Sequence, residues 1–283
     1  DDGFYNLMVG ATDIGQGSDT ILAQIAAETL MCDMKDVIVY SSDSDLTPFD
    51  TGAYASSTTY VSGNAVYKAA LKMKKMLITE AALALGVLEE TIEYDGKTFT
   101  SGEANITINN LSNRLYYNED QKQLTATDSY VGTKSPPPFM AGYVEIDVDI
   151  ETGEVDIINY VSVVDCGTTI NPMLAKGQVE GGILQGVGMA MFEEVLYTKK
   201  GQLITNDLLN YHIPSRLDIK NLITEFADSY EASGPYGAKS VGEIGIDTPP
   251  AAIANAVYNA VGVRIQTLPI TPEKILKGLK EKG

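Results

Sequence analysis

A glutamate near the end of the chain stands in surroundings that suit a general base. Glu243 closes the run Gly237-Ala238-Lys239-Ser240-Val241-Gly242-Glu243, in which glycines and apolar residues predominate. Desolvation of a carboxylate raises its pKa towards the range in which it can accept a proton. The same carboxylate can instead cap nearby backbone NH groups or pair with Lys239, and the residues alone leave both interpretations open.

Two loops contain the residue types that bind anions. Asp13-Ile14-Gly15-Gln16-Gly17-Ser18 joins an expected strand to a helix N-terminus, where free backbone NH groups and the helix dipole favour a phosphate. Residues Asp50 to Thr59 present hydroxyls without bulk ahead of a second helix. A tight turn that needs two glycines and an ordinary Ser/Thr-rich loop explain the same residues without a ligand.

One expected helix contains an unusual number of glycines. Asn171-Pro172 predicts a helix start, and the helix is expected to continue to Phe192. Its glycines are Gly177, Gly181, Gly182, Gly186 and Gly188. Each destabilises a helix interior by roughly 1 kcal/mol relative to alanine. We therefore expect another group to approach the backbone of this helix closely.

The residues that commonly bind structural or catalytic metals are sparse. His212 is the only histidine, and we expect it to pack or cap, because a zinc site and a His-based triad both lack parts. Cys32 and Cys166 are far apart in apolar surroundings, which predicts free buried thiols. The run Asp43-Ser44-Asp45 lacks the spaced ligands of a calcium loop and is interpreted as a solvated loop.

Composition narrows the function classes further. The chain has 283 residues, of which 44% are hydrophobic, so it can bury a sizeable core. Its formal net charge of -18 excludes a general electrostatic footprint for nucleic acid or anionic lipid. No stretch approaches the roughly 18 apolar residues of a membrane span, and Asp1 to Tyr5 lack the start of a secretory signal. The expected location is the cytoplasm.

The elements that must position these residues form two lobes in this interpretation. The first lobe is expected to begin with strand Phe4 to Val9, a helix capped by Ser18 and strand Val37 to Tyr40. A helix from Gly63 to Leu85, which Gly86 ends, follows them. Thr91 to Thr100 predicts a hairpin that turns at Asp95-Gly96, with a further short strand at Ile106 to Ile108. The polar run Asn113 to Pro138 predicts the boundary between lobes 1–138 and 139–283.

The second lobe begins with a hairpin in this interpretation. Its expected elements are strands Gly142 to Ile150 and Glu154 to Val164, the glycine-containing helix, a hairpin at Lys200-Gly201, a helix from Pro249 to Val261 and a last helix from Thr271-Pro272. The whole pattern predicts an α+β fold of two lobes, each with mixed sheets and packed helices.

Four segments, taken in this order, resemble the C-terminal half of the molybdopterin-binding subunit of the xanthine dehydrogenase and aldehyde oxidase family, the molybdenum hydroxylases. These segments are Gly10 to Gly17, Asp50 to Ala65, Asp165 to Gly182 and Gly237 to Glu243. Together they cover essentially the whole chain and are far more specific than any one of them. In extent the chain is similar to the split medium molybdopterin subunit of nicotinate dehydrogenase.

The resemblance implies a molybdopterin dinucleotide with molybdenum, with cytosine as the expected base in a bacterial enzyme. The residues that would hold this cofactor are Gly15, Gln16, Gly17, Ala55, Ser56, Thr58, Gln178 and Gly242, and no side chain is assigned as a metal ligand. Glu243 matches the catalytic glutamate of the family. It would take a proton while water-derived oxygen is inserted at an electron-poor carbon of an N-heterocycle or an aldehyde, with the redox chemistry supplied by the cofactor.

The resemblance also implies partner chains. No iron-sulfur cysteine pattern or flavin fingerprint is present, so iron-sulfur clusters and FAD are expected on further subunits. The family's upstream half, with its substrate-orienting arginine, has no counterpart here, and Ser57 stands where many bacterial relatives have an arginine. We therefore expect a hetero-oligomer with the second molybdopterin-subunit half, and a large apolar docking face on this chain.

Two other function classes fit parts of the pattern. A non-catalytic dinucleotide-binding or assembly subunit would keep the two anion loops and perform no chemistry, and Glu243 distinguishes it from an enzyme. An acidic extracellular calcium-binding module would require calcium-dependent stability.

Overall fold

The computed structural model describes residues 3–117 and 121–282, and these form two compact units. The first unit comprises Asp1–Pro136 and Tyr230–Ser240, and the second comprises Pro137–Ser229 and Val241–Gly283. The short Tyr230–Ser240 segment thus folds with residues that lie more than half the chain away. The sequence predicts this segment in the second lobe, because nothing in its local pattern indicates its distant contacts.

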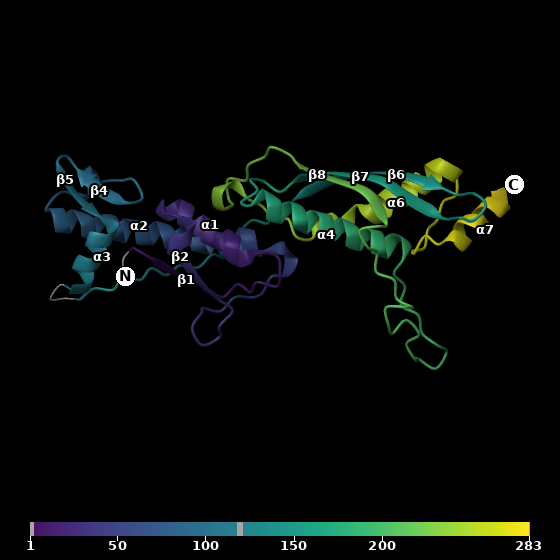
Figure 1. The fold of residues 1–283 in the computed structure, drawn as a ribbon, viewed down its shortest axis with the longest axis horizontal. Helices are drawn as coiled ribbons and strands as arrows, with labels where there is room; N and C mark the ends of the chain where they lie inside the picture. Colours follow the sequence, from purple (N-terminus) through teal and green to yellow (C-terminus); the bar gives the residue numbers. More distant parts are fainter. Residues whose placement is uncertain (1–2, 118–120, 283) are drawn as a thin grey trace. The chain divides into compact units, whose positions relative to one another are not determined.

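The first unit starts with a strand, a helix and a parallel strand. Strand β1 (Tyr5–Val9) pairs with β2 (Val37–Ser41) in parallel, and helix α1 (Ser18–Leu30) connects them, as the sequence predicts (Figure 1). One face of the two strands is covered, whereas Met8, Ile38 and Tyr40 on the other face are each more than 40% exposed. Parallel sheets usually have both faces covered, so this outer face is an apolar surface without a covering layer in the chain described here.

Helix α2 (Gly63–Leu85) is the longest helix of the first unit and packs against α1. It continues directly from a π-helical turn at Thr58–Ser62, and it ends where Gly86 takes a left-handed conformation with φ of 69°. Both the helix and its glycine stop are predicted from the sequence. The π-helical turn is not, although such turns are frequent at functional sites.

A small sheet and a third helix complete the first unit. Strands β3 (Glu93–Tyr94), β4 (Thr98–Ser101) and β5 (Ala104–Thr107) form an antiparallel sheet, with the first turn at the predicted position. Helix α3 (Ile108–Tyr117) follows, and here the expectation of a polar loop from Asn113 is wrong for its first residues. Leu111 and Leu115 are one helical turn apart and both are buried, which stabilises a helix in an otherwise polar run. Residues 118–120 of that run lie outside the described residues.

The second unit is built on a three-stranded sheet in the order β6-β7-β8. Strand β6 (Phe139–Val148) pairs with β7 (Val155–Asp165) in antiparallel fashion, as predicted. Strand β8 (Ile219–Phe226) lies parallel to β7 and was not expected from the sequence. Its buried residues Ile219 and Thr224 do not alternate regularly with exposed ones, so the period of two that identifies a strand is weak.

Helices cover one face of this sheet and form the main core with it (Figure 1). They are α4 (Pro172–Met191), the short α5 (Ile244–Asp247), α6 (Pro249–Val261) and, at the end of the chain, α7 (Pro272–Lys282). In α4, Val179, Ile183 and Val187 are fully buried at helical spacing, and the Asn171 side chain caps the first turn by accepting from the Leu174 amide at 3.1 Å. The mixed sheets and helices confirm the predicted α+β class.

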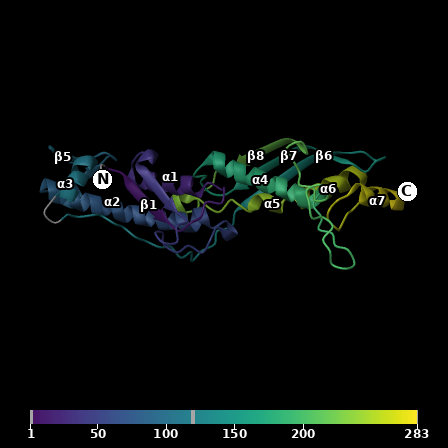
Figure 2. The same ribbon diagram turned by 60° about the horizontal axis from the view of Figure 1, so that its bottom comes forward.

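A long loop connects α4 to β8 and projects from the second unit (Figure 2). The hairpin expected at Lys200-Gly201 is present as a short one, with an antiparallel bridge between Tyr197 and Leu203 and a hydrogen bond from the Thr198 amide to the Gln202 carbonyl oxygen at 2.8 Å. Leu208 and Leu209 are 75% and 84% exposed, and His212 is exposed as well, so the expectation that this histidine packs is wrong. Among the described residues, none of the helices combines the length and the apolar character that crossing a bilayer requires.

Candidate functional site

The glycine loop between β1 and α1 is organised by its own aspartate. The Asp13 carboxylate accepts hydrogen bonds from the backbone amides of Gly15 at 2.8 Å, Gly17 at 3.3 Å and Asp19 at 3.3 Å. The expectation of free NH groups throughout this loop is therefore wrong for these three amides. A carboxylate already occupies part of the positive end of α1, which is where the helix dipole favours negative charge.

Gln16 stabilises the same loop from the other side. Its Nε2 atom donates to the Thr12 carbonyl oxygen at 2.9 Å, and its Oε1 atom accepts from the Ile14 amide at 2.6 Å. Gly15 and Gly17 have φ angles of 99° and 83°, which residues with a Cβ rarely adopt. The aspartate, the glutamine and the two glycines of this loop are thus explained by the loop conformation that they stabilise together.

The first testable prediction concerns Asp13. Burial by itself raises the pKa of this carboxyl, but the amides of Gly15, Asp19 and Gly17 outweigh it and lower the pKa below the ordinary value. A lowered folded-state pKa means that the stabilisation is present above the ordinary pKa of aspartate and is lost as pH falls through the lowered value. We expect the Gly15 and Gly17 amides to exchange faster in Asp13→Asn, and in the wild type at acid pH, as measured by NMR hydrogen exchange.

Asp43→Asn is the matched control for this prediction. Asp43 accepts from the Asp45 and Leu46 amides at 2.9 and 3.3 Å in a separate exposed turn of the same unit. Its replacement should leave exchange at Gly15 and Gly17 unchanged. Equal exchange in Asp13→Asn and the wild type would contradict the role of the Asp13 carboxylate.

The start of α1 contains polar atoms without partners. Ser18 is only 1% exposed, and its Oγ atom has no hydrogen-bond partner; the Oδ1 atom of Asp19 is likewise buried and unpaired. Gly17 occupies the N-cap position, so the prediction that Ser18 caps the helix is wrong. A buried hydroxyl without a partner is unfavourable, and beside a glycine loop it is an observation that favours a missing polar ligand.

The Ser/Thr-rich loop has an unusual backbone at the predicted binding residues. Ala55 and Ser56 have φ angles of 51° and 53°, and neither is a glycine. Such left-handed residues cost of order 1–3 kcal/mol and are enriched at ligand sites. Thr58 follows at the start of the π-helical turn and is 8% exposed. The strain therefore lies at Ala55 and Ser56, two of the three residues of this loop that are predicted to bind the cofactor.

Gly10 brings the two loops of the first unit together. A Cβ built at Gly10 would lie 2.1 Å from the carbonyl oxygen of Pro48 and 2.8 Å from the Cβ atom of Asp50. Asp50 in turn accepts from the Gly52 amide at 2.8 Å and from the Ser62 hydroxyl at 2.9 Å. The second loop therefore begins in direct contact with the first, and both precede the helices α1 and α2.

In the second unit, Glu243 directly precedes α5. It is exposed, so the expectation that this chain desolvates the carboxylate is wrong for the residues described here. Gly242 next to it is half-buried. Val241 and Ile244, which flank this part of the sequence, pack against the core of the unit.

The glycines of α4 have two different explanations. A Cβ at Gly182 would lie 3.0 Å from the Cα atom of Gly245, and a Cβ at Gly186 would lie 2.8 Å from the carbonyl oxygen of Ile246. The predicted close approach is confirmed for these glycines, and the approaching group is the backbone of α5. A Cβ at Gly177 or Gly181 would meet nothing within 4 Å.

Gln178 follows one of these open glycines. It is half-buried on α4, while Gly177 and Gly181 on either side of it leave their surroundings open. In α4, Gly182 and Gly186 therefore contact the segment that follows Glu243, whereas Gly177 and Gly181, on either side of Gln178, are open. These glycines are consistent with room for a ligand near Gln178.

Two tyrosines, for which the sequence predicts no role, form hydrogen bonds between distant parts of the first unit. Tyr60 is 4% exposed and its hydroxyl lies 2.8 Å from that of Ser233. Tyr236 has a φ angle of 52°, and its hydroxyl lies 2.8 Å from that of Thr29. Both contacts join residues more than 170 positions apart, so no local pattern could predict them.

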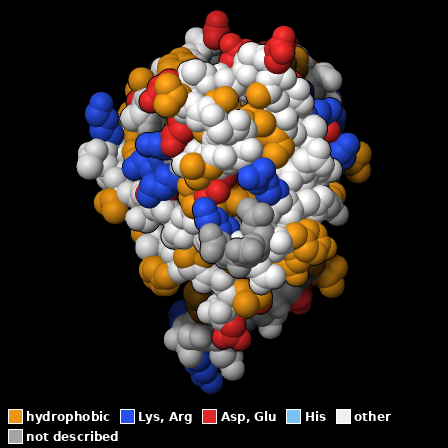
Figure 3. Space-filling model, turned by 90° about the vertical axis from the view of Figure 1, so that its left-hand side faces the viewer, with side chains coloured by type: hydrophobic (Ala, Val, Ile, Leu, Met, Phe, Trp, Pro, Cys, Tyr) orange, Lys and Arg blue, Asp and Glu red, His pale blue; other side chains and the backbone are white. Residues whose placement is uncertain are grey.

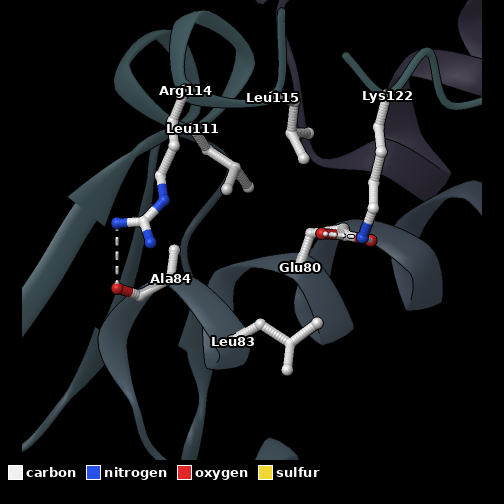
Figure 4. A pocket seen from close by; sticks show the side chains of 7 residues that line it. All are labelled: Glu80, Leu83, Ala84, Leu111, Arg114, Leu115 and Lys122. Carbon is white, nitrogen blue, oxygen red and sulfur yellow. Dashed lines mark hydrogen bonds and ion pairs between the residues drawn. The ribbon is translucent and has the colours of Figure 1, made fainter. Parts of the chain in front are cut away.

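A shallow hollow of the first unit lies away from these residues, between α2 and α3 (Figure 4). The Lys122 ammonium pairs with Glu80 at 3.0 Å, and Arg114 donates to the Ala84 carbonyl oxygen at 3.2 Å, so the polar groups that line the hollow are paired within the chain. No predicted site residue lines it.

Metal-ligand clusters add no second site to the described part of the chain. In residues 3–117 and 121–282, no three His, Cys, Asp or Glu side chains gather so that they could hold a metal ion. The face of the first unit drawn in Figure 3 mixes lysine and arginine side chains with acidic and hydrophobic ones. Cys32 and Cys166 form no disulfide in the described residues; Cys166 is buried, as predicted, whereas Cys32 is only half-buried.

Comparisons with known proteins agree on one group of relatives. The sequence model of the molybdopterin cofactor-binding domain matches residues 1–220. The xanthine dehydrogenase molybdenum-binding subunit of Escherichia coli O157:H7 is 39% identical over 97% of this chain and 37% of its own length. The gamma subunit of the 6-hydroxypseudooxynicotine dehydrogenase complex of Paenarthrobacter nicotinovorans is 32% identical over 96% of this chain and 36% of its own length.

A solved structure agrees with these sequences. The crystal structure of quinoline 2-oxidoreductase from Pseudomonas putida 86 superposes with a TM-score of 0.87 at 29% identity, over 96% of this chain and 36% of that chain. The chain therefore spans little more than a third of the length of the relatives it matches.

Proposed function

Because this chain belongs to the molybdopterin cofactor-binding domain family, which confirms the expected resemblance, we propose that it is the cofactor-holding part of a molybdenum hydroxylase. The observation that carries the proposal is the first unit's pair of loops, which meet where Gly10 lies against Pro48 and Asp50. One contains Gly15, Gln16 and Gly17 beside the unpaired Ser18 hydroxyl, and the other contains the strained residues Ala55 and Ser56.

These residues fit the phosphate groups of a pterin dinucleotide. Ser18 offers a buried hydroxyl without a partner, and Ala55, Ser56 and Thr58 offer a strained loop at the start of a helix, where backbone NH groups favour anions. Asp13 neutralises part of the same helix end, so the phosphate would bind to the remaining donors. Cytosine is the base that we propose for the nucleotide.

The second unit would supply the chemistry of the site. We assign Gln178 to the pterin, since the open glycines around it leave room for a ligand. We also assign Gly242, the residue before Glu243, to the binding of the cofactor. Glu243 would hold and release the proton that leaves as water-derived oxygen is transferred to an electron-poor carbon. When bound, the cofactor would supply the redox chemistry. An N-heterocycle or an aldehyde is the proposed class of substrate.

A functional enzyme would require further polypeptide. The relatives are named as subunits, and this chain corresponds to little more than a third of each. The remaining part of such a molybdenum-binding subunit would cover apolar side chains that this chain exposes. They are Met8, Ile38 and Tyr40 on the two parallel strands, and Leu208 and Leu209 on the projecting loop. Iron-sulfur and FAD subunits would accept the electrons. We propose a cytoplasmic hetero-oligomer.

The exposure of Glu243 supports the same requirement. A general base works best when water is excluded from its surroundings. In this chain by itself, Glu243 is exposed to solvent. The cofactor, the substrate and the missing polypeptide are therefore the groups that would desolvate it.

The experiment that tests the proposal is metal and pterin analysis of the protein purified with its native partners. Elemental analysis and mass spectrometry should find stoichiometric molybdenum and a pterin dinucleotide. An assembled complex without either would contradict the proposal and favour the second candidate, a non-catalytic dinucleotide-binding or assembly subunit, for which the two loops of the first unit would be sufficient.

A further inference from the structure

A segment of the first unit runs along α2 without belonging to any helix or strand (Figure 2). We call its residues 123–131 the strap. Every second residue of the strap is half-buried, and these residues are Leu124, Ala126, Asp128 and Tyr130. The residues between them are exposed. Such alternation with a period of two is typical of an extended strand that lies with one face on a support.

Side chains of α2 hold the strap in this extended form. The Lys72 ammonium pairs with the Asp128 carboxylate at 2.8 Å and donates to the Thr127 carbonyl oxygen at 3.1 Å. The Lys68 ammonium lies 4.8 Å from the centre of the Tyr130 ring, which adds a cation–π contact. As the strap advances, its partners step back along the helix from Lys72 to Lys68. The strap is therefore fixed antiparallel to α2.

The backbone of the strap has one open edge. Within residues 3–117 and 121–282, no backbone–backbone hydrogen bond involves residues 123–131. Two odd-numbered residues bond to side chains instead: the Thr127 carbonyl oxygen accepts from Lys72, and the Ser129 amide donates to the Asp128 carboxylate at 2.7 Å. In an extended chain, neighbouring residues direct their N–H and C=O groups to opposite edges. The edge of the even-numbered residues is therefore the open one.

The strap also lacks the residues by which proteins protect a free strand edge. Such edges commonly carry charged side chains or proline. The exposed side chains of the strap are uncharged, and they are Gln123, Thr125, Thr127, Ser129 and Val131. Its one charged residue, Asp128, pairs with Lys72. The first prolines after it stand at Pro136 to Pro138, where they would end strand pairing. An edge of this composition is suited to pair with another strand.

We propose that the edge of the even-numbered strap residues binds a β-strand of the remaining part of the molybdenum-binding subunit. The identity of this partner rests on the proposed function. This chain matches 37% and 36% of the length of two relatives, so most of each relative lies outside it. A second copy of this chain is disfavoured, because each copy has a net charge of -18. Main-chain hydrogen bonds would hold the added strand.

Hydrogen exchange of the assembled complex, resolved to single residues by mass spectrometry with fragmentation, tests the pairing. A strand that pairs along one edge protects every second amide. The amides of Leu124, Ala126 and Asp128 should therefore exchange about 100-fold more slowly than those of Thr125 and Thr127. Equal exchange at even- and odd-numbered residues, whether fast or slow, would overturn the proposal.

Ala126→Pro and Thr125→Pro form a matched pair of variants. Proline removes one N–H group and is compatible with an extended backbone. Ala126→Pro removes a donor from the open edge, so the Leu124 and Asp128 amides should exchange about tenfold faster or more. Thr125→Pro removes a donor from the other edge and should leave both amides unchanged. The opposite result, or the same exchange in both variants, would contradict the choice of edge. The wild-type pattern decides the proposal if a variant does not fold.

Photo-cross-linking identifies the partner strand. The probe p-benzoylphenylalanine would be introduced at position 131, where the Val131 side chain is 83% exposed. We expect cross-links to a peptide of the remaining molybdenum-binding polypeptide. Cross-links solely to this chain, or solely to an iron-sulfur or flavin subunit, would overturn the proposal. A complex without molybdenum would instead contradict the proposed function, and the exchange pattern and the cross-links would still decide the docking, since neither requires the cofactor.

Discussion

Glu243→Gln is expected to lower kcat for hydroxylation by about 100- to 10,000-fold, the range typical for loss of a general base. Glutamine has nearly the same size as glutamate and cannot accept the proton. Glu243 is exposed at the start of α5 and is not part of the core, so the variant should fold normally and keep its molybdenum and pterin. The measurement is kcat of the assembled enzyme, normalised to molybdenum content.

Asp247→Asn provides the control for this prediction. Asp247 is another exposed carboxylate, at the end of the same short helix. Its replacement removes the same charge four residues away and should leave kcat within about twofold, as expected for a group outside the chemistry. Activity in Glu243→Gln equal to that of the wild type would contradict the assignment of the base and favour the non-catalytic subunit.

Two alanine substitutions in α4 are expected to change stability in opposite directions. At Gly186 the new Cβ would lie 2.8 Å from both the Ile246 carbonyl oxygen and the Pro249 ring, and overpacking of this kind destabilises by about 1–3 kcal/mol. At Gly181 the Cβ would meet nothing within 4 Å. Alanine there removes the helix penalty of glycine and should stabilise by roughly 1 kcal/mol.

The measurement is the melting temperature of the chain, supported by hydrogen exchange over α4 and α5. For a unit of this size each kcal/mol corresponds to a shift of about 2–8 °C. Gly186→Ala should melt lower and expose α5 to exchange, while Gly181→Ala should melt higher. If both variants shifted in the same direction, the close packing of α5 on α4 would not be the reason for the glycine at Gly186.

Local patterns predicted the elements that are stabilised by local interactions. Helix α2 was predicted to its last residue because its stop depends on Gly86, whose left-handed conformation is encoded in a single residue type. Helix α3 and strand β8 were missed because they are stabilised by distant contacts. Leu111 and Leu115 contact the core formed with α2, and β8 pairs with a strand roughly 60 residues earlier in the chain.

The candidate site shows the same difference. The motif residues Gly15, Gln16 and Gly17 lie in one loop, as the sequence predicts, but the role of Asp13 inside that loop depends on geometry that residue types do not reveal. The apolar sequence around Glu243 suggested burial, yet its neighbours turn towards the core and leave the carboxylate outside. Residue types and their spacing identify the chemical groups of a candidate site, but they do not determine which of these groups are shielded from solvent.

The Tyr230–Ser240 segment also has a consequence for the order in which the chain folds during synthesis. The first unit includes this segment, although the rest of it is complete at Pro136. At typical rates of synthesis the intervening residues take on the order of 5–20 s to emerge from the ribosome. During that time Tyr60 lacks its contact with Ser233 and Thr29 lacks its contact with Tyr236, so the nascent first unit is an open intermediate. The two units therefore cannot mature strictly one after the other, and a gene fragment that ends at residue 138 would encode an incomplete domain.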